Sequence, residues 1–473
     1  MDSFIKSQMC VFRHGNFSLD LCHPDSVSKP LVYQTRAFAT ENSGSNFSII
    51  SSSFWLNELE FNFSIQHNLH KGNNMKKNTT ALVRKANKAL VLTTIKDNEP
   101  ITLEDVLKIT NLSRPTAHTI IKELMDDKLV YKHGYAESSG GRMPILYCFN
   151  ATAHYAIGVD FEFPPVRLII SDLKGKLIHS KGWVFSRNVS KEKVIDDLLH
   201  GIEEIIIDSG ISKEKFIGIG VGLPGIIDYE KGLSKNIERI ANWHNVNIKE
   251  ILQKRLELPV YIRNDVHLLG LIEKELYQGV NMSNFIYIGI RAGTGMAIFI
   301  NDTFFKGMMG NAGFLGHTIV ESEGPNCTCG NKGCLETYTS ELAIVRRYLE
   351  AANLGFSEEN DNLSVSDIIE KANENDPLAI EILESSGQYL GIAISNLIKI
   401  LEIPTVIIGG LVDTKKQIFL NSVIQEANKN LLNYSIDTPF IIKGSLTHES
   451  FALGGCLLVI DNFNKAPFLR VHI

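Results

Sequence analysis

The stretch His317–Glu336, HTIVESEGPNCTCGNKGCLE, decides how the second half of this 473-residue chain is organised. Its three cysteines are spaced C-x-C-x4-C, and a histidine lies ten residues before the first of them. Zn²⁺ prefers four tetrahedral nitrogen and sulfur ligands, and three cysteines with one histidine complete that shell without a position for water. We therefore predict a structural zinc site, with the ligands His317, Cys327, Cys329 and Cys334.

The loop between the last two cysteines favours a metal site over the alternative, three free thiols on a surface loop. Gly330 and Gly333 allow the backbone conformations that wrap a loop round an ion. Glu336 follows the last cysteine by two positions, so its carboxylate is expected beside the metal.

The composition is that of a large globular protein. Hydrophobic residues make up 44% of the chain, an ordinary value for globular domains, and 473 residues exceed what one compact core holds, so two or three domains are expected. There is no apolar run of membrane-spanning length and no secretory start. Seven cysteines, three of them at metal spacing, suit a reducing compartment. We expect a cytoplasmic protein without a membrane partner.

Charge is distributed unevenly along the chain, whose formal net charge is −6. Residues 75–150 carry 12 Lys or Arg against 8 Asp or Glu, whereas residues 151–473 carry 30 against 39. An excess of basic residues favours a polyanionic partner such as nucleic acid. In this chain only residues 75–150 have that sign.

Residues 1–74 differ in composition from the rest, with 12 serines, 8 asparagines and no sustained helical or strand period. Two interpretations stay open. One is a disordered tail, which such a composition favours. The other is a non-native extension before a true start at Met75, since the codons of residues 71–74 permit a purine-rich tract like a bacterial ribosome-binding site. No function is assigned to this segment.

Three helices are expected at the start of residues 75–150. The first ends near Lys96 and has its apolar positions at Leu82, Ala86, Ala89, Leu90 and Thr93. A second runs from an N-cap at Thr102 through Thr110. Ser113 caps the third, with Pro115 in its first turn, where a missing N–H costs little.

The third helix has one apolar face and one polar, basic face. Its inward residues are expected to be Ala117, Ile120, Ile121 and Leu124. Its outer face is expected to carry Arg114, Thr116, His118, Thr119 and Lys122. Two helices joined by a short turn, with such a face on the second, predict a DNA-binding helix-turn-helix; the alternative is a small bundle with a solvated face.

Two apolar segments, residues 129–131 and 145–149, flank Ser138-Ser139-Gly140-Gly141-Arg142 and predict a β-hairpin. A hairpin after a helix-turn-helix is the wing of a winged helix, with Arg142 at its tip. The third helix would then enter the major groove, and Arg142 would either enter the narrow minor groove or contact phosphate only.

Residues 151–473 alternate apolar strands with helices. Strand pairs are expected near 155–171 and 285–300, and glycine-rich turns follow several strands. This pattern predicts a duplicated α/β fold in two lobes, residues 151–275 and 276–473, with a ligand cleft between them.

From about residue 80 to the end, the chain resembles the ROK family of sugar kinases and transcriptional regulators. The shared motifs are Gly222-Leu223-Pro224-Gly225, Asn264-Asp265, Gly293-Thr294-Gly295, residues 313–317 and the cysteine block 327–336. The wing sequence SSGGRMP at 138–144 is similar to that of the regulator branch. The resemblance implies an actin-like (ribonuclease H-like) α/β body preceded by a winged helix-turn-helix.

The chain departs from the family's kinases at the turn whose glycines approach ATP phosphates. The matching stretch is Asp160-Phe161-Glu162-Phe163-Pro164-Pro165. Glu162 adds negative charge, Phe163 blocks close approach, and the prolines remove N–H donors. Gly293-Thr294-Gly295 and Gly409-Gly410 are retained, but they also serve as tight turns. We therefore expect no ATP binding and no enzymatic activity.

The sugar-binding residues implied by the resemblance are better retained. Asn264 and Asp265 match the pair that binds sugar hydroxyls, and the alternative for Asp265 is an N-cap of the following helix. His317 matches the histidine that binds zinc through one nitrogen and sugar through the other, and Glu336 matches a further sugar-contacting carboxylate. Phe314 stands where the family usually has Glu; it would either stack on a sugar ring or fill the core.

Together these features predict a sugar-responsive regulator, most simply a repressor of carbohydrate genes. Its partners would be a double-stranded DNA operator and a sugar or sugar derivative. Paired half-sites require at least a homodimer, and a homotetramer is equally compatible. The alternatives are a ROK sugar kinase with an accessory DNA-binding domain, and a regulator controlled by a protein partner instead of a sugar.

Overall fold

The computed structural model describes residues 75–137, 143–162, 165–185, 189–237, 240–354, 363–410, 416–431, 439–447 and 450–465. All of them belong to one compact unit, residues 71–473. The predictions for residues 1–74, for Arg142 at the wing tip and for Phe163 and Pro164 lie outside the described residues.

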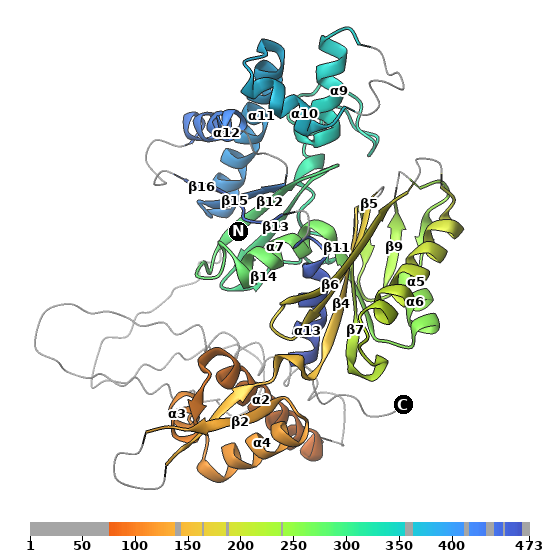
Figure 1. Ribbon diagram of the computed structural model, residues 1–473. Helices are drawn as coiled ribbons and strands as arrows, with labels where there is room; N and C mark the ends of the chain where they lie inside the picture. The colour runs from red at the N-terminus through yellow and green to blue at the C-terminus, as the bar shows by residue number, and fades with distance from the viewer. Residues whose placement is uncertain are drawn as a thin grey trace, which may run out of the picture. The chain divides into compact units, whose positions relative to one another are not determined.

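The first part of this unit is a three-helix domain with a small sheet (Figure 1, orange). Its elements are α2 (Met75–Asn98), β1 (Ile101–Thr102), α3 (Leu103–Thr110), α4 (Arg114–Asp126), β2 (Val130–Tyr135) and β3 (Ile145–Phe149). The sheet has the order β1-β3-β2, and both pairings are antiparallel. The predicted hairpin is therefore present, and we call residues 75–150 the winged-helix domain.

The predicted helix starts are confirmed by their hydrogen bonds. The hydroxyl of Thr102 accepts from the backbone N–H of Asp105 at 3.3 Å. The hydroxyl of Ser113 accepts from the N–H of Thr116 at 3.4 Å, and Pro115 lies in the first turn of α4. Each cap satisfies a backbone donor that has no partner inside its helix.

The buried face of α4 is the predicted one, but the face predicted for α2 was wrong. Ala117, Ile120, Ile121 and Leu124 are all buried. On α2, however, Ala86 and Thr93 are exposed, and Val91, Leu92 and Ile95 form the core face. The larger apolar side chains thus take the buried face in place of the smaller Ala86 and Thr93. Lys88 lies on this face too, and its ammonium is 2.8 Å from the carboxylate of Asp127, the residue after α4.

Two five-stranded sheets form the body, residues 151–473, and they repeat one topology. The first has the order β11-β7-β4-β5-β6, and the second β14-β13-β12-β15-β16. In each sheet the central strand pairs antiparallel on one side and parallel on the other. This repeat confirms the predicted duplicated α/β fold.

The strands of the first sheet are β4 (Tyr155–Phe161), β5 (Pro165–Asp172), β6 (Leu177–Val184), β7 (Phe216–Leu223) and β11 (Val260–Asn264). Those of the second are β12 (Phe285–Ile290), β13 (Thr294–Ile300), β14 (Thr303–Phe304), β15 (Thr405–Gly410) and β16 (Phe440–Lys443). A small third sheet joins β8 (Ile227–Asp228), β9 (Leu233–Asn236) and β10 (His244–Val246).

Helices surround these sheets (Figure 1). They are α5 (Lys191–Asp208), α6 (Ile248–Leu256), α7 (Asp265–Leu276), α8 (Glu336–Thr339), α9 (Glu341–Ala351), α10 (Val365–Asn373), α11 (Pro377–Leu401), α12 (Ile418–Lys429) and α13 (Leu453–Lys465). Short 3₁₀ turns are η1 (Ala151–Ala153), η2 (Lys213–Lys215) and η3 (Leu315–His317). No helix among the described residues is long and apolar enough to cross a membrane.

Helix α13 packs against β4 and β7 of the first sheet, although the division at residue 275 places it with the second lobe. Glycines make this contact possible. A Cβ at Gly158 would lie 2.0 Å from the carbonyl oxygen of Ala452, and one at Gly220 would lie 2.0 Å from that of Gly455. The end of the chain therefore completes the core of the lobe formed by its first strands.

Candidate functional site

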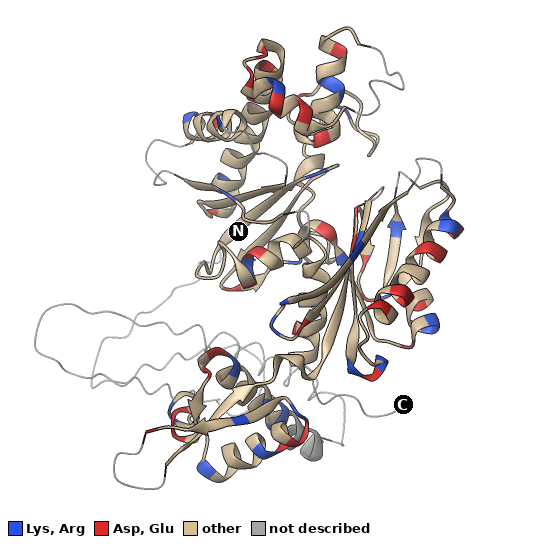
Figure 2. Cartoon of the chain, in the orientation of Figure 1, with Lys and Arg blue, Asp and Glu red and all other residues tan. Residues whose placement is uncertain are grey.

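The predicted DNA-contacting residues of α4 share one solvent-exposed face. Its members are Arg114, Thr116, His118, Thr119 and Lys122, and each is exposed. Arg114 is ion-paired with Glu104 of α3, and the hydroxyl of Thr119 donates to the carbonyl of Pro115 at 2.8 Å. Both charge signs occur on this domain (Figure 2). Glu123 pairs with Arg84 and Lys88 of α2, so some of the basic charge is neutralised there.

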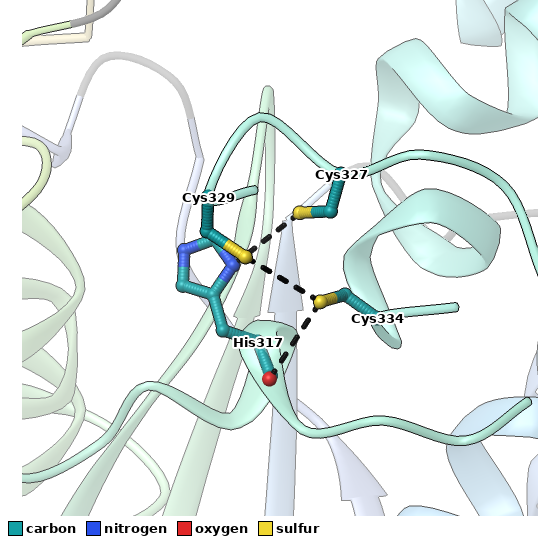
Figure 3. A group of neighbouring side chains, drawn as sticks. All are labelled: His317, Cys327, Cys329 and Cys334. Atoms are coloured by element: carbon teal, nitrogen blue, oxygen red, sulfur yellow. Dashed lines mark hydrogen bonds between the residues drawn. The ribbon is translucent and has the colours of Figure 1, made fainter. Parts of the chain in front are cut away.

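The predicted metal ligands come together in one cluster. The ligand atoms of His317, Cys327, Cys329 and Cys334 all lie within 4.8 Å of one another, and Figure 3 shows the four side chains pointing toward one another. His317 Nδ1 lies 3.6 Å from Cys327 Sγ, and the sulfurs of Cys329 and Cys334 are also 3.6 Å apart.

These spacings suit a tetrahedral ion. Bond lengths of about 2.3 Å to sulfur and 2.1 Å to nitrogen place two sulfur ligands about 3.8 Å apart, and sulfur and nitrogen about 3.6 Å apart. The residues present therefore fit a metal ion. They would hold it through His317 Nδ1, which leaves Nε2 of the same ring for another partner.

Asn264 and Asp265 lie where β11 ends and α7 begins. The predicted alternative, that Asp265 caps the helix, was wrong, because Asn264 is the cap: its Oδ1 accepts from the N–H groups of Val266 and His267 at 3.1 and 3.3 Å. The Asn264 amide also donates to the carbonyl of Gly225, at 3.3 Å. Asp265 is the first helical residue.

The segment 291–295, which is the turn after β12 and the first two residues of β13, contacts both Asp265 and Glu336. At one end, Nη1 of Arg291 is 3.8 Å from Oδ2 of Asp265. At the other, the Glu336 carboxylate accepts from the N–H of Thr294 at 2.9 Å. Gly316, next to His317, packs on the carbonyl of Thr294 and on Glu336. One turn thus joins three of the predicted sugar-binding positions.

A buried cluster of ion pairs lies at the end of β4 and the start of β5, the stretch that the sequence resemblance matches to a phosphate-binding turn. Arg291 donates to both oxygens of Asp160, at 3.0 and 2.7 Å, and to Glu162. Arg167 of β5 donates to the same two carboxylates, at 3.0 and 3.1 Å. The guanidinium of Arg291 also lies over the ring of Phe451, 4.5 Å from its centroid.

This cluster revises the electrostatic argument made from the sequence. Burial opposes ionisation of Glu162, but Arg291 and Arg167 lower the pKa of its carboxyl group below the usual value. Burial likewise opposes the charge on Arg291, but Asp160 and Glu162 raise its pKa. Glu162 therefore does not present an uncompensated negative charge; both arginines are engaged with it.

Asp265 has an unusual environment. Burial raises the pKa of its carboxyl group to about 6, although the opposite charge of Arg291 acts to lower it. Its side chain is 12% exposed. A carboxylate that is partly accessible and poised near neutral pH is typical of a functional position.

His267, two residues after Asp265, holds a loop that leads to the metal cluster. Its Nε2 lies 2.7 Å from the carbonyl oxygen of Ala312, and its Nδ1 lies 3.2 Å from the hydroxyl of Tyr229. Because a carbonyl only accepts, Nε2 carries the hydrogen and Nδ1 accepts from Tyr229. Burial lowers the pKa of His267 to about 4, which keeps the ring neutral.

Phe314 follows this loop and is 38% exposed. The alternative that it fills the core is therefore wrong. Its ring centroid lies 6.1 Å from that of His317, so it borders the predicted sugar-binding positions.

The retained glycines of β15 have a packing role. A Cβ at Gly409 would lie 2.1 Å from the Tyr287 hydroxyl, and one at Gly410 would lie 1.7 Å from the carbonyl of Ile290. Their presence is explained without a nucleotide.

The sequence did not predict the roles of Arg291, Arg167 and His267. The only available signal for the arginines was Glu162 itself, since a carboxylate in an apolar hairpin requires a buried cation nearby. His267 offered no signal, because histidine on a buried helical face is ordinary.

The sequence of this chain is similar to those of known proteins. The ROK family model matches residues 156–462. The xylose repressor of Bacillus subtilis (strain 168) is 30% identical over 381 residues, which cover 80% of this chain and 96% of that protein. The N-acetylglucosamine repressor of Escherichia coli O157:H7 is 27% identical over 382 residues, 80% of this chain and 93% of that one.

Among solved structures, a ROK family transcriptional regulator, a homologue of the E. coli MLC protein, superposes with a TM-score of 0.71 at 24% identity, over 81% of this chain and 97% of that one. The match confirms the predicted fold class. On the match to the family model and the shared fold, the chain belongs to the ROK family.

Proposed function

We propose that the chain is a sugar-responsive, DNA-binding transcriptional regulator, most simply a repressor of carbohydrate-utilisation genes. The observation that carries this is the union, in one chain, of an exposed helix-turn-helix face with a ROK body whose phosphate-binding turn is occupied by ion pairs. The relatives named as repressors of xylose and N-acetylglucosamine genes support it.

Operator DNA would be bound by α4 in the major groove. His118, Thr119 and Thr116 offer hydrogen-bonding groups for base edges, whereas Lys122 and Arg114 offer charge for phosphates. Arg142 would contact the minor groove or a phosphate. Because operators are paired half-sites, a homodimer or a homotetramer is the expected form, acting in the cytoplasm.

The effector would be a sugar held near the 291–295 turn. The carboxylate of Asp265 would accept hydrogen bonds from sugar hydroxyls, and the side-chain N–H of Asn264 would donate to one. Glu336 and His317 would contact the other side of the sugar ring. The relatives are named for different sugars, xylose and N-acetylglucosamine. Residues that border this position, Phe314 among them, would determine which sugar is bound.

The metal would be zinc, held by His317, Cys327, Cys329 and Cys334. When bound, it supplies structural cross-linking and no reactive water, because four protein ligands fill the tetrahedral shell. The loop that these four residues anchor would fix the position of the His317 ring and of the start of α8, where Glu336 lies.

The experiment is release of operator DNA by sugars. DNA that binds the purified protein is selected from a random library, and its affinity is measured with and without D-xylose, D-glucose and N-acetyl-D-glucosamine. Weakened binding with at least one sugar is expected. If the DNA affinity is the same with every sugar, regulation by these sugars is excluded.

Phosphorylation assays separate the regulator from a ROK kinase with an accessory DNA-binding domain. With both carboxylates of the former phosphate turn engaged by arginine, we expect no phosphorylation of these sugars by ATP. Sustained turnover by the pure protein that is abolished in Asp265→Asn would establish the kinase instead.

A further inference from the structure

The ion cluster links the proposed sugar-binding carboxylate to the opposite lobe. Asp160 lies on β4 and Glu162 directly after it, whereas Arg291 comes from the turn after β12, about 130 residues later in the chain. Arg291 is 4% exposed and Asp160 is 3% exposed. Beyond these two carboxylates, the nearest acidic group to Arg291 is Asp265, 3.8 Å from its Nη1.

Only Arg291 connects the cluster to Asp265 among the described ion pairs. Arg167 is paired with Asp160 and Glu162. The charged and titratable groups that face Asp265 are Arg291, Asp160, Glu162, Tyr229 and Tyr287. Arg291 is the one cation in this set, so the charge of Asp265 depends on it.

We propose that Arg291 is a positioning residue that, clamped by Asp160 and Glu162, fixes the Asp265 carboxylate for hydrogen bonding to an uncharged sugar. The inference deepens the proposed function and rests on it for the identity of the ligand. It uses two residues, Arg291 and Glu162, that the family resemblance does not assign to sugar binding.

The charge balance selects the class of sugar. Asp160, Glu162 and Asp265 are three carboxyl groups against two guanidinium groups, Arg167 and Arg291, and every guanidinium already faces a carboxylate. A third guanidinium, that of Arg263, lies over the rings of Tyr229 and Phe304, 5.8 and 5.2 Å from their centroids. A phosphate beside Asp265 would therefore meet that carboxylate and two arginines already engaged by carboxylates. The effector is therefore a neutral sugar and not a sugar phosphate.

Removal of Arg291 has an effect that a purely structural residue would not have. An opposite charge at this distance lowers the pKa of a carboxyl group by about 1–3. In Arg291→Met, the pH at which Asp265 ionises rises accordingly. Sugar affinity should fall roughly two- to ninety-fold at pH 7 and recover toward pH 9, as ionisation is restored.

The test measures sugar affinity by calorimetry between pH 5 and pH 9 in the full-length parent, Arg291→Met, Arg291→Lys and Arg167→Met. D-xylose, D-glucose, N-acetyl-D-glucosamine and the 6-phosphates of the last two are the probes. The midpoint of the pH profile should lie near 6 in the parent and move upward in Arg291→Met. Arg291→Lys should restore the midpoint, and Arg167→Met, which removes the other arginine, should move it less.

An equal midpoint in the parent and Arg291→Met overturns the proposal, as does tighter binding of a 6-phosphate than of its parent sugar. A second measurement needs no sugar: the difference in unfolding free energy between Asp265 and Asp265→Asn, taken against pH with and without Arg291→Met. If no sugar binds, the proposed function falls, yet this difference still shows whether Arg291 controls Asp265. If Arg291→Met does not fold, Arg291→Lys decides, because a midpoint that differs from the parent's although the positive charge is kept would contradict control of Asp265 by that charge.

Discussion

The winged-helix domain and the body expose their functional residues in opposite ways. The five candidate DNA contacts lie on one exposed face of α4 and come from nine consecutive residues, Arg114–Lys122. The body instead gathers Asp160, Arg291 and Asp265 from three separated segments, and each is largely buried. A substitution on the exposed face of α4 is expected to change DNA affinity without changing the stability of the fold. In the body, a substitution of one of these buried residues is expected to change both ligand binding and stability.

The largest expected effect is in the metal cluster of the body. Cys329→Ser should abolish stoichiometric zinc and the sugar response, and it should lower the melting temperature. Binding of structural zinc contributes on the order of 10 kcal/mol in small metal domains. Elemental analysis of protein purified without chelator measures the metal.

Cys148→Ser is the matched control, since Cys148 is buried in the winged-helix domain away from the cluster. Zinc retained at one per chain in Cys329→Ser, or absent from the parent protein, would contradict the metal assignment.

The next largest effect is expected from Asp265, where ligand binding and stability are expected to depend on the same carboxyl group. Asp265 ionises near pH 6 in the folded protein and near 3.8 when unfolded, so the folded state binds the proton more tightly. Stability contributed by this group is present below the unfolded pKa and is lost as pH rises through the folded pKa. Asp265→Asn should therefore be more stable than the parent above pH 6, by at most about 3 kcal/mol, with no gain near pH 3.

Chemical denaturation at several pH values measures this difference. Asp302→Asn is a control of opposite sign, because the hydrogen bond from Lys274 lowers the pKa of Asp302. A gain in Asp265→Asn that is the same at pH 3 and pH 8 would show that the Asp265 charge is not its cause. Loss of the sugar response in this variant is expected at every pH.

Smaller effects belong to the exposed face of α4. Thr119→Ala or His118→Ala should change the preference for particular bases by roughly 1–3 kcal/mol per direct contact. Lys122→Ala should weaken binding to all DNA sequences alike. It should also reduce the salt dependence of DNA binding by the amount expected for about one phosphate contact. Binding to a set of operator variants at several salt concentrations separates the two, with melting temperatures unchanged throughout.

Identical base preferences in the Thr119 and Lys122 variants would mean that a different face of α4 meets the DNA. A fall in melting temperature in the Thr119 or the Lys122 variant would show that the exposed face of α4 also contributes to stability, contrary to the distinction drawn between α4 and the body.

The smallest effect is expected from removal of residues 1–74. A chain that starts at Met75 should bind operator DNA with the affinity of the full chain and release it at the same sugar concentration. Loss of operator binding would show that the segment contributes to recognition, and the interpretation of a misplaced start would then be untenable.

The local features of this protein could be predicted from its sequence. The helix caps at Thr102 and Ser113, the buried face of α4 and the clustering of four side chains that could hold a metal depend on residues close together in the chain, where spacing and side-chain chemistry are sufficient. The alternation of strands and helices also indicated the duplicated fold.

Only the tertiary structure decided the rest. It showed that Asn264 caps α7, and that the buried face of α2 includes Lys88, whose ammonium is paired with Asp127. It also showed that Glu162 is paired with arginines from β5 and from the turn after β12. These contacts join residues up to about 130 positions apart, and no periodicity in the chain records which buried charges meet. The sequence alone determined the types of residue and their local order, while packing of the two sheets determined their partners, because the charge of a buried group depends on what the fold places beside it.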